Sequence, residues 1–395
     1  MTVADDFQAD TANPPCPPFS KGGTERDRSP PFSTGGLGGD FERAAVMSAS
    51  GSQANSQQRR KIVWIEAALL IAFLLLPLAI DDFWVLFATR VFILSLLALS
   101  FDLVWGYAGI LSFGQALFFG VAGYSCALLA TKLGVTSILA LLPMAALVGL
   151  IVALTLAFLV ILGKRIPTTV FVALGTLTGS YVVERLARGW SYVGGQNGIS
   201  SLPRLTISGH EIEEGKVYYY LALAILIATY AGLRWLTRSQ FGLVLAGVRL
   251  QESRMAFFGY KVQNYKGAVF ALAGMIAGVS GGLYAFHEGY VGPGQLGPVL
   301  STQVVLYVLF GGVGTLAGAV IGVGIIDLLS FFLSERWETG WPIVLGLLLL
   351  AVILFRPTGL IGLFVSERER VGSFGKRESA RKEKPASGTT EPSTS

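Results

Sequence analysis

The sequence has 395 residues, of which 52% are hydrophobic and only 14% are charged, and its mean hydropathy is +0.60. This composition excludes an ordinary soluble globular protein and indicates a chain whose main solvent is a lipid bilayer. The net charge of +5 does not indicate nucleic-acid binding, because most Lys and Arg residues stand in short stretches beside apolar segments. The two cysteines, Cys16 and Cys126, are too few for a disulfide framework or a metal site.

The two ends of the chain are predicted to be disordered. Residues 1–60 are rich in Pro, Gly and Ser and contain the near-repeats PPFSKGG and PPFSTGG. Such a composition buries too little apolar surface to offset the entropy of ordering, and it lacks the apolar stretch of a signal peptide. A more ordinary lead-in begins at Met47, so residues 1–46 are interpreted as an over-extended gene start or a dispensable tail. Residues 365–395 are basic and Ser-rich and are expected not to pack.

Residues 61–364 are predicted to form a transmembrane permease domain. Its long apolar runs each approach the roughly 20 residues that cross a hydrocarbon core. They must be helices, because an open sheet would leave backbone groups unpaired in lipid. The predicted fold is therefore an all-α polytopic integral membrane protein with about 9–10 transmembrane helices, including broken or re-entrant ones. The predicted runs are 61–80, 83–105, 108–131, 137–163, 168–187, 217–236, 267–286, 299–333 and 342–357.

The run 299–333 is too long for a single crossing. At about 1.5 Å per residue it would extend roughly 50 Å, whereas the hydrocarbon core is about 30 Å thick. The sequence Gly311-Gly312-Val313-Gly314 is the predicted break. This break would leave two short helices that meet inside the membrane.

Basic residues in the loops set the predicted orientation, because Lys and Arg are enriched on the cytoplasmic side. Asp81, Asp82 and residues 188–216 then fall outside. A cytoplasmic C-terminal tail requires the run 299–333 to start and finish on the outer side, which independently favours the broken pair. The basic residues expected inside are Arg59, Arg60, Lys61, Lys164, Arg165, Arg238, Arg249, Arg254, Lys261, Lys266, Arg368 and Arg370.

Glycine-rich breaks at membrane depth are the first functional signal, because irregular backbone is tolerated there only against protein or a water-filled path. One break covers residues 106–115, and a second covers residues 289–297 and 311–314. Close helix packing is the alternative explanation, and it is favoured for the series Gly274/Gly278/Gly282 and Gly314/Gly318/Gly322. The candidate translocation-path residues are Gly106, Gly109, Ser112, Gly114, Gln115, Gly311, Gly312 and Gly314.

The segment 237–266 is the second functional signal, because it is predicted to be amphipathic rather than membrane-spanning. A soluble partner could dock on it, and a passive position in the bilayer interface is the alternative. The residues expected on its apolar side are Val244, Val248, Met255, Phe257 and Phe258, and the charged residues beside them are Arg249, Glu252 and Arg254.

Ionisable residues at membrane depth are costly, so each is a functional candidate. Arg90 and Asp102 are 12 positions apart, near one face of the same predicted helix, and are expected to pair with other helices. Structural pairing is also preferred over solute contact for Asp327. His287 and Glu288 adjoin the second glycine-rich break, where they could touch solute or a solute-binding protein, but structural pairing or interface exposure is preferred over solute contact for each of these ionisable residues.

Five motifs, in order along the chain, resemble a known family. They are GYAGILSFGQALFFGVAGY from Gly106, the segment 242–259, YKGAVFALAGMIAGVSGGLYA from Tyr265, LFGGVGTLAGAVIG from Leu309 and FRPTGLIG from Phe355. Together they resemble the LivM-type permeases of ABC importers for branched-chain amino acids, whose close relatives carry urea and short amides. The resemblance covers about residues 60–365 and is specific for the family rather than for the substrate.

The resemblance implies a multi-pass permease in the bacterial inner membrane, with both termini in the cytoplasm. It also implies a heterodimer with a LivH-type permease, two cytosolic ABC ATPases and an extracytoplasmic solute-binding protein. The sequence contains no Gly-x-x-x-x-Gly-Lys-Ser/Thr phosphate loop, so ATP is expected on the partner subunits and no cofactor on this chain. By resemblance, residues 242–259 form the loop that couples to the ATPase, with Gly242, Arg249, Glu252, Arg254 and Gly259 at the matching positions.

Three alternatives remain open at this point. Branched-chain amino acids are the cargo expected from the resemblance, and urea or short amides are the other candidates. An ion-coupled secondary transporter also uses broken helices, although the predicted helices offer few carboxylates besides Asp102 and Asp327. A passive channel is the third alternative. A membrane enzyme is disfavoured, because no nucleophile–base or metal-ligand spacing surrounds His210 or His287.

Overall fold

The computed structural model describes residues 73–78, 80–160, 169–207, 210–211, 215–336 and 340–355. The predicted tails, 1–60 and 365–395, lie outside the described residues, as do most of the predicted span 61–80 and most of the motif that starts at Phe355. Residues 73–78 are helical, in agreement with the end of that first span.

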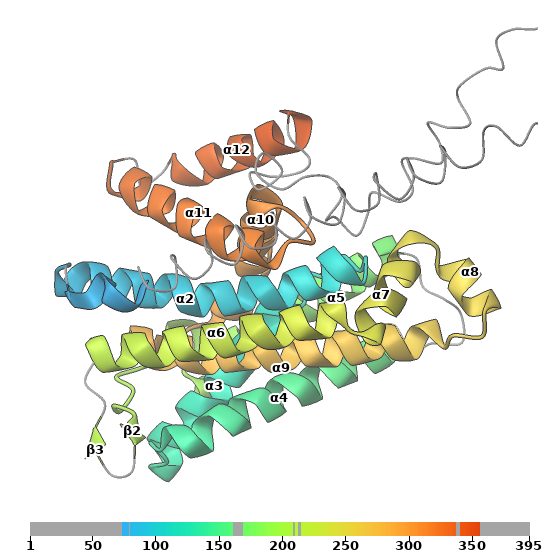
Figure 1. Ribbon diagram of the computed structural model, residues 1–395. Helices are drawn as coiled ribbons and strands as arrows, with labels where there is room; N and C mark the ends of the chain where they lie inside the picture. The colour runs from blue at the N-terminus through green and yellow to red at the C-terminus, as the bar shows by residue number, and fades with distance from the viewer. Residues whose placement is uncertain are drawn as a thin grey trace, which may run out of the picture. The chain divides into compact units, whose positions relative to one another are not determined.

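Almost all of the described elements are helices (Figure 1). The α-helices are α2 (Asp82–Asp102), α3 (Gln115–Leu133), α4 (Ile138–Val160), α5 (Thr169–Gly189), α6 (Lys216–Arg238), α7 (Gln240–Leu250), α8 (Glu252–Phe257), α9 (Val262–Glu288), α10 (Pro298–Gly311), α11 (Leu316–Arg336) and α12 (Trp341–Phe355). A π-helical turn, η1 (Leu103–Tyr107), continues α2, and the short 3-10 turns are η2 (Ser191–Val193), η3 (Gly195–Asn197) and η4 (Pro293–Leu296).

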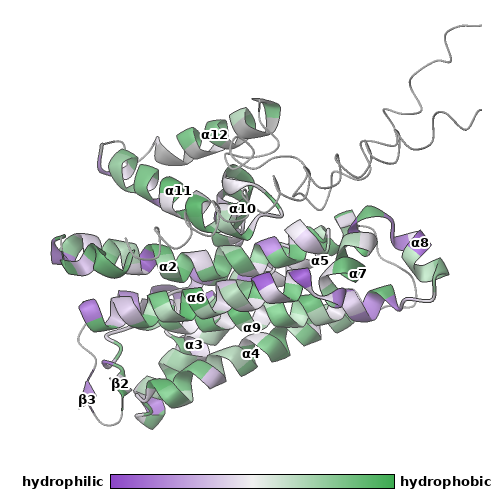
Figure 2. Cartoon of the chain, in the orientation of Figure 1, coloured by the Kyte–Doolittle hydropathy of each residue, from purple (hydrophilic) through white to green (hydrophobic). Residues whose placement is uncertain are grey.

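Seven helices of the described chain are long and apolar enough to cross a membrane: α2 with η1, α3, α4, α5, α6, α9 and α11. Hydrophobic residues run along these helices (Figure 2), and many of their side chains are exposed as well as buried. On α4, for example, Leu139 and Phe158 are 71% and 70% exposed, as expected where lipid is the solvent. The predicted all-α polytopic membrane fold is therefore confirmed.

Small residues allow α9 to pack closely against α2, α3 and α4. A β-carbon at Gly274 or Gly278 would collide with the α4 backbone beside Gly149, and one at Gly318 or Gly322 would collide with the end of α10. These positions confirm the prediction that glycines at four-residue spacing are packing faces. Gly314, which the same pattern assigned to a packing face, precedes α11 and lies in the break instead.

Two short antiparallel sheets lie at one end of the bundle. They are formed by β1 (Ile199–Ser200) with β4 (Tyr290–Val291), where Ile199 stands opposite Val291, and by β2 (Thr206–Ile207) with β3 (His210–Glu211). The segment predicted to form an outer loop, 188–216, therefore meets the segment 289–297. The helices α7 and α8 lie at the opposite end (Figure 1).

The break predicted in the run 299–333 is confirmed, but the prediction of two short helices holds for α10 alone, because α11 has 21 residues and is long enough to cross a membrane. Helix α10 ends at Gly311 and α11 begins at Leu316, and Gly312 and Gly314 between them have φ of 125° and 79°, a region that favours glycine. The predicted start of the third span near residue 108 is wrong. Helix α3 begins only at Gln115, because Gly109 turns the chain into the left-handed region at φ 73°.

Candidate translocation path and coupling site

Three interruptions of regular helix lie within the described bundle. They are residues 108–114 after η1, residues 289–297 between α9 and α10, and residues 312–315 between α10 and α11. Backbone groups at these places need hydrogen-bond partners other than their own helix. The hydrogen bonds that these backbone groups make with other segments bring the predicted path segments together.

The π-helical turn η1, which precedes the first interruption, meets the third interruption at Gly106 and Gly314. The amide nitrogen of Gly314 donates a hydrogen bond of 2.7 Å to Oδ1 of Asp102, whose side chain is fully buried. A β-carbon at Gly106 would lie only 2.6 Å from that amide nitrogen, so a larger residue could not approach as closely. Asp102, Gly106 and Gly314 are called the glycine junction below.

Arg249 of α7 reaches the glycine junction from the segment that was predicted to couple to an ATPase. Its Nη1 donates a hydrogen bond to the carbonyl oxygen of Gly106. Its Cγ lies 3.0 Å from the place that a β-carbon would take at Gly109. Burial lowers the pKa of the Arg249 guanidinium, and the carboxylate of Asp102 opposes that shift. One charged side chain therefore connects the predicted coupling segment with the predicted path.

Three hydroxyl groups that the sequence analysis did not single out hold the interruptions together. The amide of Phe113 donates to Oγ1 of Thr176 at 2.9 Å, and Oγ of Ser301 donates to the carbonyl oxygen of Phe113 at 2.6 Å. Oγ of Ser180 donates to the carbonyl oxygen of Leu296, also at 2.6 Å. The signal that could have found two of them is the four-residue spacing of buried hydroxyls on α5, which places both on one face.

Other predicted path residues have separate roles. Oγ of Ser112 accepts a hydrogen bond from the amide of Gly114 at 3.1 Å, so it fixes the turn into α3. Oε1 of Gln115 accepts from Oγ of Ser100 at 3.1 Å, and Nε2 of the same buried side chain has no partner among the described residues. Gly311 serves helix packing, since a β-carbon there would collide with the carbonyl of Gly318 in α11.

The remaining predicted coupling residues lie in α7, α8 or the turn that follows α8. Glu252 forms an ion pair with Lys266, which joins α8 to α9. Arg254 is exposed, and Gly259 has φ of 87° with open space where a β-carbon would stand. Gly242 is buried against the end of α6. The structure therefore brings only Arg249 of this group to the glycine junction.

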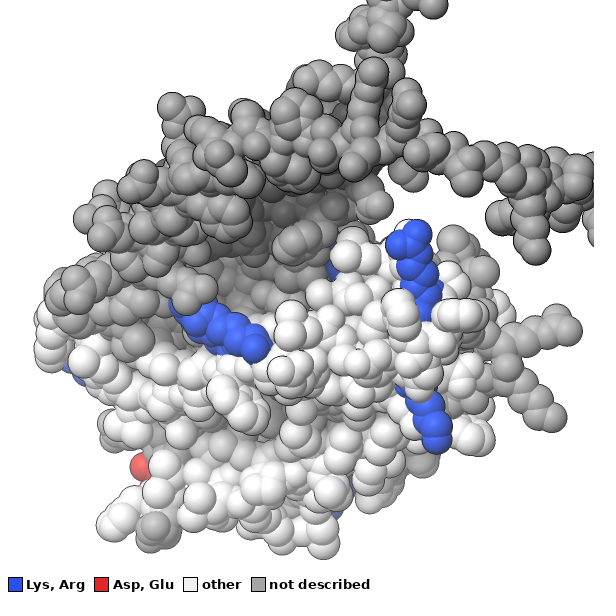
Figure 3. All heavy atoms as spheres, turned by 45° about the vertical axis from the view of Figure 1, so that its right-hand side comes forward, with Lys and Arg blue, Asp and Glu red and all other residues white. Residues whose placement is uncertain are grey.

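The apolar side predicted for the coupling segment is not a single face. Val248 is buried in the bundle, whereas Phe257 and Phe258 are 92% and 74% exposed at the end of α8. Arg254 and Lys261 are exposed nearby in the sequence. Figure 3, which brings this end of the chain forward, shows several Lys and Arg side chains and almost no Asp or Glu. Exposed aromatic residues among cations favour an interface with another protein.

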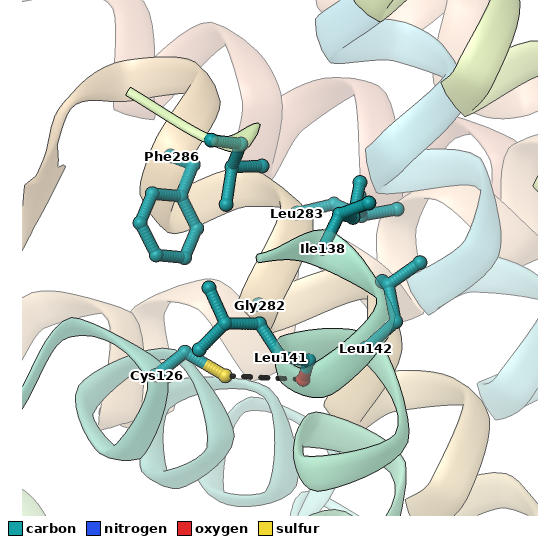
Figure 4. Close-up of a pocket in the computed structure, with 8 residues that line it drawn as sticks. Cys126, Ile138, Leu141, Leu142, Gly282, Leu283 and Phe286 are labelled. Atoms are coloured by element: carbon teal, nitrogen blue, oxygen red, sulfur yellow. Dashed lines mark hydrogen bonds between the residues drawn. The ribbon is translucent and has the colours of Figure 1, made fainter. Parts of the chain in front are cut away.

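The small cavity between α3, α4 and α9 is a poor candidate for the path of a polar solute. Its lining is apolar and includes Ile138, Leu283 and Phe286, while Sγ of Cys126 donates a long hydrogen bond of 3.6 Å to the carbonyl oxygen of Leu141 (Figure 4). Such a lining gives a polar solute little to bind. Among the described residues, no three His, Cys, Asp or Glu side chains are grouped to hold a metal ion.

Comparison with known proteins gives one family. A sequence profile described as "Branched-chain amino acid transport system / permease component" matches residues 83–355. The high-affinity branched-chain amino acid transport system permease proteins LivM of Salmonella typhimurium and of Escherichia coli are each 27% identical over 317 residues, which is 74% of this chain and 73% of theirs. The corresponding permease protein BraD of Pseudomonas aeruginosa is 25% identical over 41% of this chain and 54% of its own. No solved structure matches the chain.

Proposed function

The chain belongs to the family of branched-chain amino acid transport system permease components, and from this premise we propose that it is the permease subunit of an ATP-driven ABC importer. The observation that carries the proposal is the hydrogen bond from Arg249 to the Gly106 carbonyl. It joins a segment outside the long apolar helices to the point where two broken helices meet. A permease that is driven by another subunit needs a connection of this kind.

In this proposal one of the two cytosolic ABC ATPases of the complex docks on α7 and α8. The exposed side chains of Phe257 and Phe258 supply apolar anchors, and Arg254 supplies a positive charge beside them. The sequence contains no phosphate-loop motif, so ATP is bound and hydrolysed on those separate subunits. This chain is then a transport subunit and not an enzyme.

Closure of the ATPases would displace α7 and α8 and carry Arg249 with them. Because Arg249 holds the Gly106 carbonyl, and Asp102 holds the amide of Gly314, the movement reaches both α2 and the α10–α11 pair. The ion pair between Glu252 and Lys266 passes the same movement to α9. The helices on either side of the interruptions would thus change between two arrangements, as alternating access requires.

The other proposed partners follow from the two ends of the bundle. The basic end with α7 and α8 is assigned to the cytoplasm, together with both termini, by the distribution of Lys and Arg. The opposite end, with the segments 188–216 and 289–297, then faces a solute-binding protein outside the bacterial inner membrane. A LivH-type permease completes a heterodimer, and exposed apolar side chains on α4 and α5 are available for it or for lipid.

Branched-chain amino acids are the proposed cargo, because the similar permeases are named for their transport. Urea and short amides are the alternative cargo for the same machinery. Transport driven by an ion gradient, or passive flow through a channel, would be a different mechanism. A single uptake experiment separates all of these possibilities.

The experiment compares cells with and without the gene for uptake of radiolabelled leucine and radiolabelled urea. Each culture is assayed with ATP depleted and, separately, with the proton gradient collapsed. The proposal expects gene-dependent leucine uptake that requires ATP and survives collapse of the gradient. ATP-dependent uptake of urea alone would change the cargo. Dependence on the gradient alone would replace the importer with a secondary transporter, and uptake without either energy source would indicate a channel.

A further inference from the structure

Charged side chains from three helices form a second cluster, separate from the glycine junction. Nε of Arg90 in α2 lies 3.8 Å from Oε1 of Glu288 at the end of α9 and 3.7 Å from Oδ2 of Asp327 in α11. The hydroxyl of Tyr307 in α10 donates to Oδ1 of Asp327 at 3.4 Å, and Nε2 of Gln303 donates to that hydroxyl at 2.7 Å. Arg90, Glu288, Asp327 and Tyr307 are called the charge cluster below.

The charge cluster lies within the length of the apolar helices. Arg90 follows Asp82, the first residue of α2, by eight positions, which is about 12 Å along the axis of an α-helix. Charged side chains at such depth are costly and usually face the interior of a bundle or a water-filled path. The side chains of Arg90 and Glu288 are nevertheless 42% and 32% exposed. The charge cluster is therefore partly exposed. Charged groups are more stable in contact with water or a polar solute than in contact with lipid.

The contacts within the charge cluster leave hydrogen-bonding capacity unused. The two ion-pair distances are longer than an N–H···O hydrogen bond. Neither Nε of Arg90 nor Oδ2 of Asp327 has a hydrogen-bond partner among the described residues, although the Asp327 side chain is only 4% exposed. Buried polar atoms in folded proteins normally have partners. A bound group that supplied the missing partners would be favoured here.

We propose that the charge cluster binds the ammonium and carboxylate groups of an α-amino acid in transit. The guanidinium of Arg90 matches a carboxylate, which it can hold through paired N–H donors. The carboxylates of Glu288 and Asp327 match an ammonium group. This inference rests on the proposed function and adds to it the residues that hold the two charged groups of the zwitterionic solute. A neutral solute such as urea carries no charge to match the cluster.

The position of the charge cluster connects it with the rest of the path. Glu288 is the last residue of α9, and Gly289 begins the interruption 289–297 at the end of the bundle that carries β1 and β4. Tyr307 and Asp327 lie on α10 and α11, the two helices that flank the interruption 312–315. A solute held here would contact the same helix pair that the glycine junction connects to Arg249.

The test uses the complete complex in proteoliposomes, with purified binding protein and radiolabelled leucine. Three variants are compared with wild type: Arg90→Gln, Asp327→Asn and the double variant. Leucine transported per ATP hydrolysed should fall by about tenfold or more in all three, the change expected when a charged hydrogen-bonding partner is lost. Stimulation of ATP hydrolysis by the binding protein should persist in each. Arg185→Gln is the matched control, because Arg185 donates a hydrogen bond of 3.0 Å to the hydroxyl of Tyr181 within α5 and does not belong to the charge cluster.

A double variant that transports as well as wild type would overturn the inference, because a purely structural ion pair is relieved when both charges are removed. Single variants with normal transport per ATP would overturn it as well, while ATP-dependent leucine uptake by wild type would still support the importer. A wild-type complex that pumps urea and no amino acid would also contradict a zwitterion site. Leucine uptake that follows an ion gradient and is lost in all three variants would contradict the importer and support the charge cluster.

Discussion

A single methyl group at Gly106 tests whether the close approach of the two helix breaks is needed for transport. In Gly106→Ala the new β-carbon would lie 2.6 Å from the amide nitrogen and 2.7 Å from Cα of Gly314, and it would also collide with Oδ1 of Asp102. Backbone atoms cannot turn aside as the end of a flexible side chain can. The segments that carry Gly106 and Gly314 must therefore separate.

The free-energy cost of this substitution has two sources: overpacking, and loss of the hydrogen bond between Gly314 and Asp102. An extra carbon in a packed interior costs about 1–3 kcal/mol. Loss of the 2.7 Å hydrogen bond from Gly314 to the Asp102 carboxylate would add about 1.5–3 kcal/mol. If this strain falls on the state in which the glycine junction is closed, about 1.4 kcal/mol is enough to change its population tenfold. Uptake should therefore fall by at least about tenfold.

The assay is leucine uptake by proteoliposomes that contain the complete complex, together with thermal unfolding of the complex in detergent. Gly232→Ala in α6 is the matched control, since a β-carbon at Gly232 meets nothing within 4 Å. This control should transport normally. Normal uptake and unchanged thermal stability of Gly106→Ala would show that the methyl group fits without separating Gly106 from Gly314 and that this close approach is not needed for transport.

Three further predictions concern Arg249, the exposed end of α8 and the turn that leads into α3. Arg249→Met removes the donor to the Gly106 carbonyl, so ATP hydrolysis should continue while leucine transported per ATP falls; an unchanged ratio would argue against the connection. The double variant Phe257→Ala/Phe258→Ala should weaken binding of the ATPase subunits by about tenfold or more. Its thermal stability should be unchanged, since both side chains are exposed. Phe158→Ala on α4 is the control, and copurification of the ATPases with the double variant at the wild-type level would contradict the prediction. Thr176→Val leaves the amide of Phe113 without its hydrogen-bond partner and should destabilise the protein by about 1–3 kcal/mol. Thr178→Val is the control and should unfold like wild type, because the hydroxyl of Thr178 donates to the carbonyl of Leu174 in its own helix.

Local sequence patterns predicted the helices and the break in the run 299–333, because length, hydropathy and glycine act within a few residues. They placed the start of α3 too early for a physical reason. The apolar residues Ile110 and Leu111 match the hydropathy of the helix that follows, but the positive φ of Gly109 turns the chain before them and α3 begins only at Gln115.

The candidate site depends on contacts that no local pattern contains. Arg249 and Gly106 are 143 positions apart, so their hydrogen bond could not be read from either motif. Asp102 was predicted to pair with another helix, and its partner is a backbone amide at the break before α11 rather than a charged side chain. Thr176 and Ser180 were overlooked because isolated hydroxyl residues on an apolar helix are common and usually bond their own helix.

The most direct test measures whether nucleotide moves the coupling segment relative to the helix that follows the glycine junction. Spin labels at Leu243 of α7 and Ile325 of α11, which are 64% and 39% exposed, would report that distance in a complex with Cys16 and Cys126 replaced by alanine. Trapping the ATPases in the ATP-bound state should change the distance, and Arg249→Met should abolish that change. A distance that nucleotide leaves unaltered in wild type, or an equal change in Arg249→Met, would show that Arg249 does not couple the two segments.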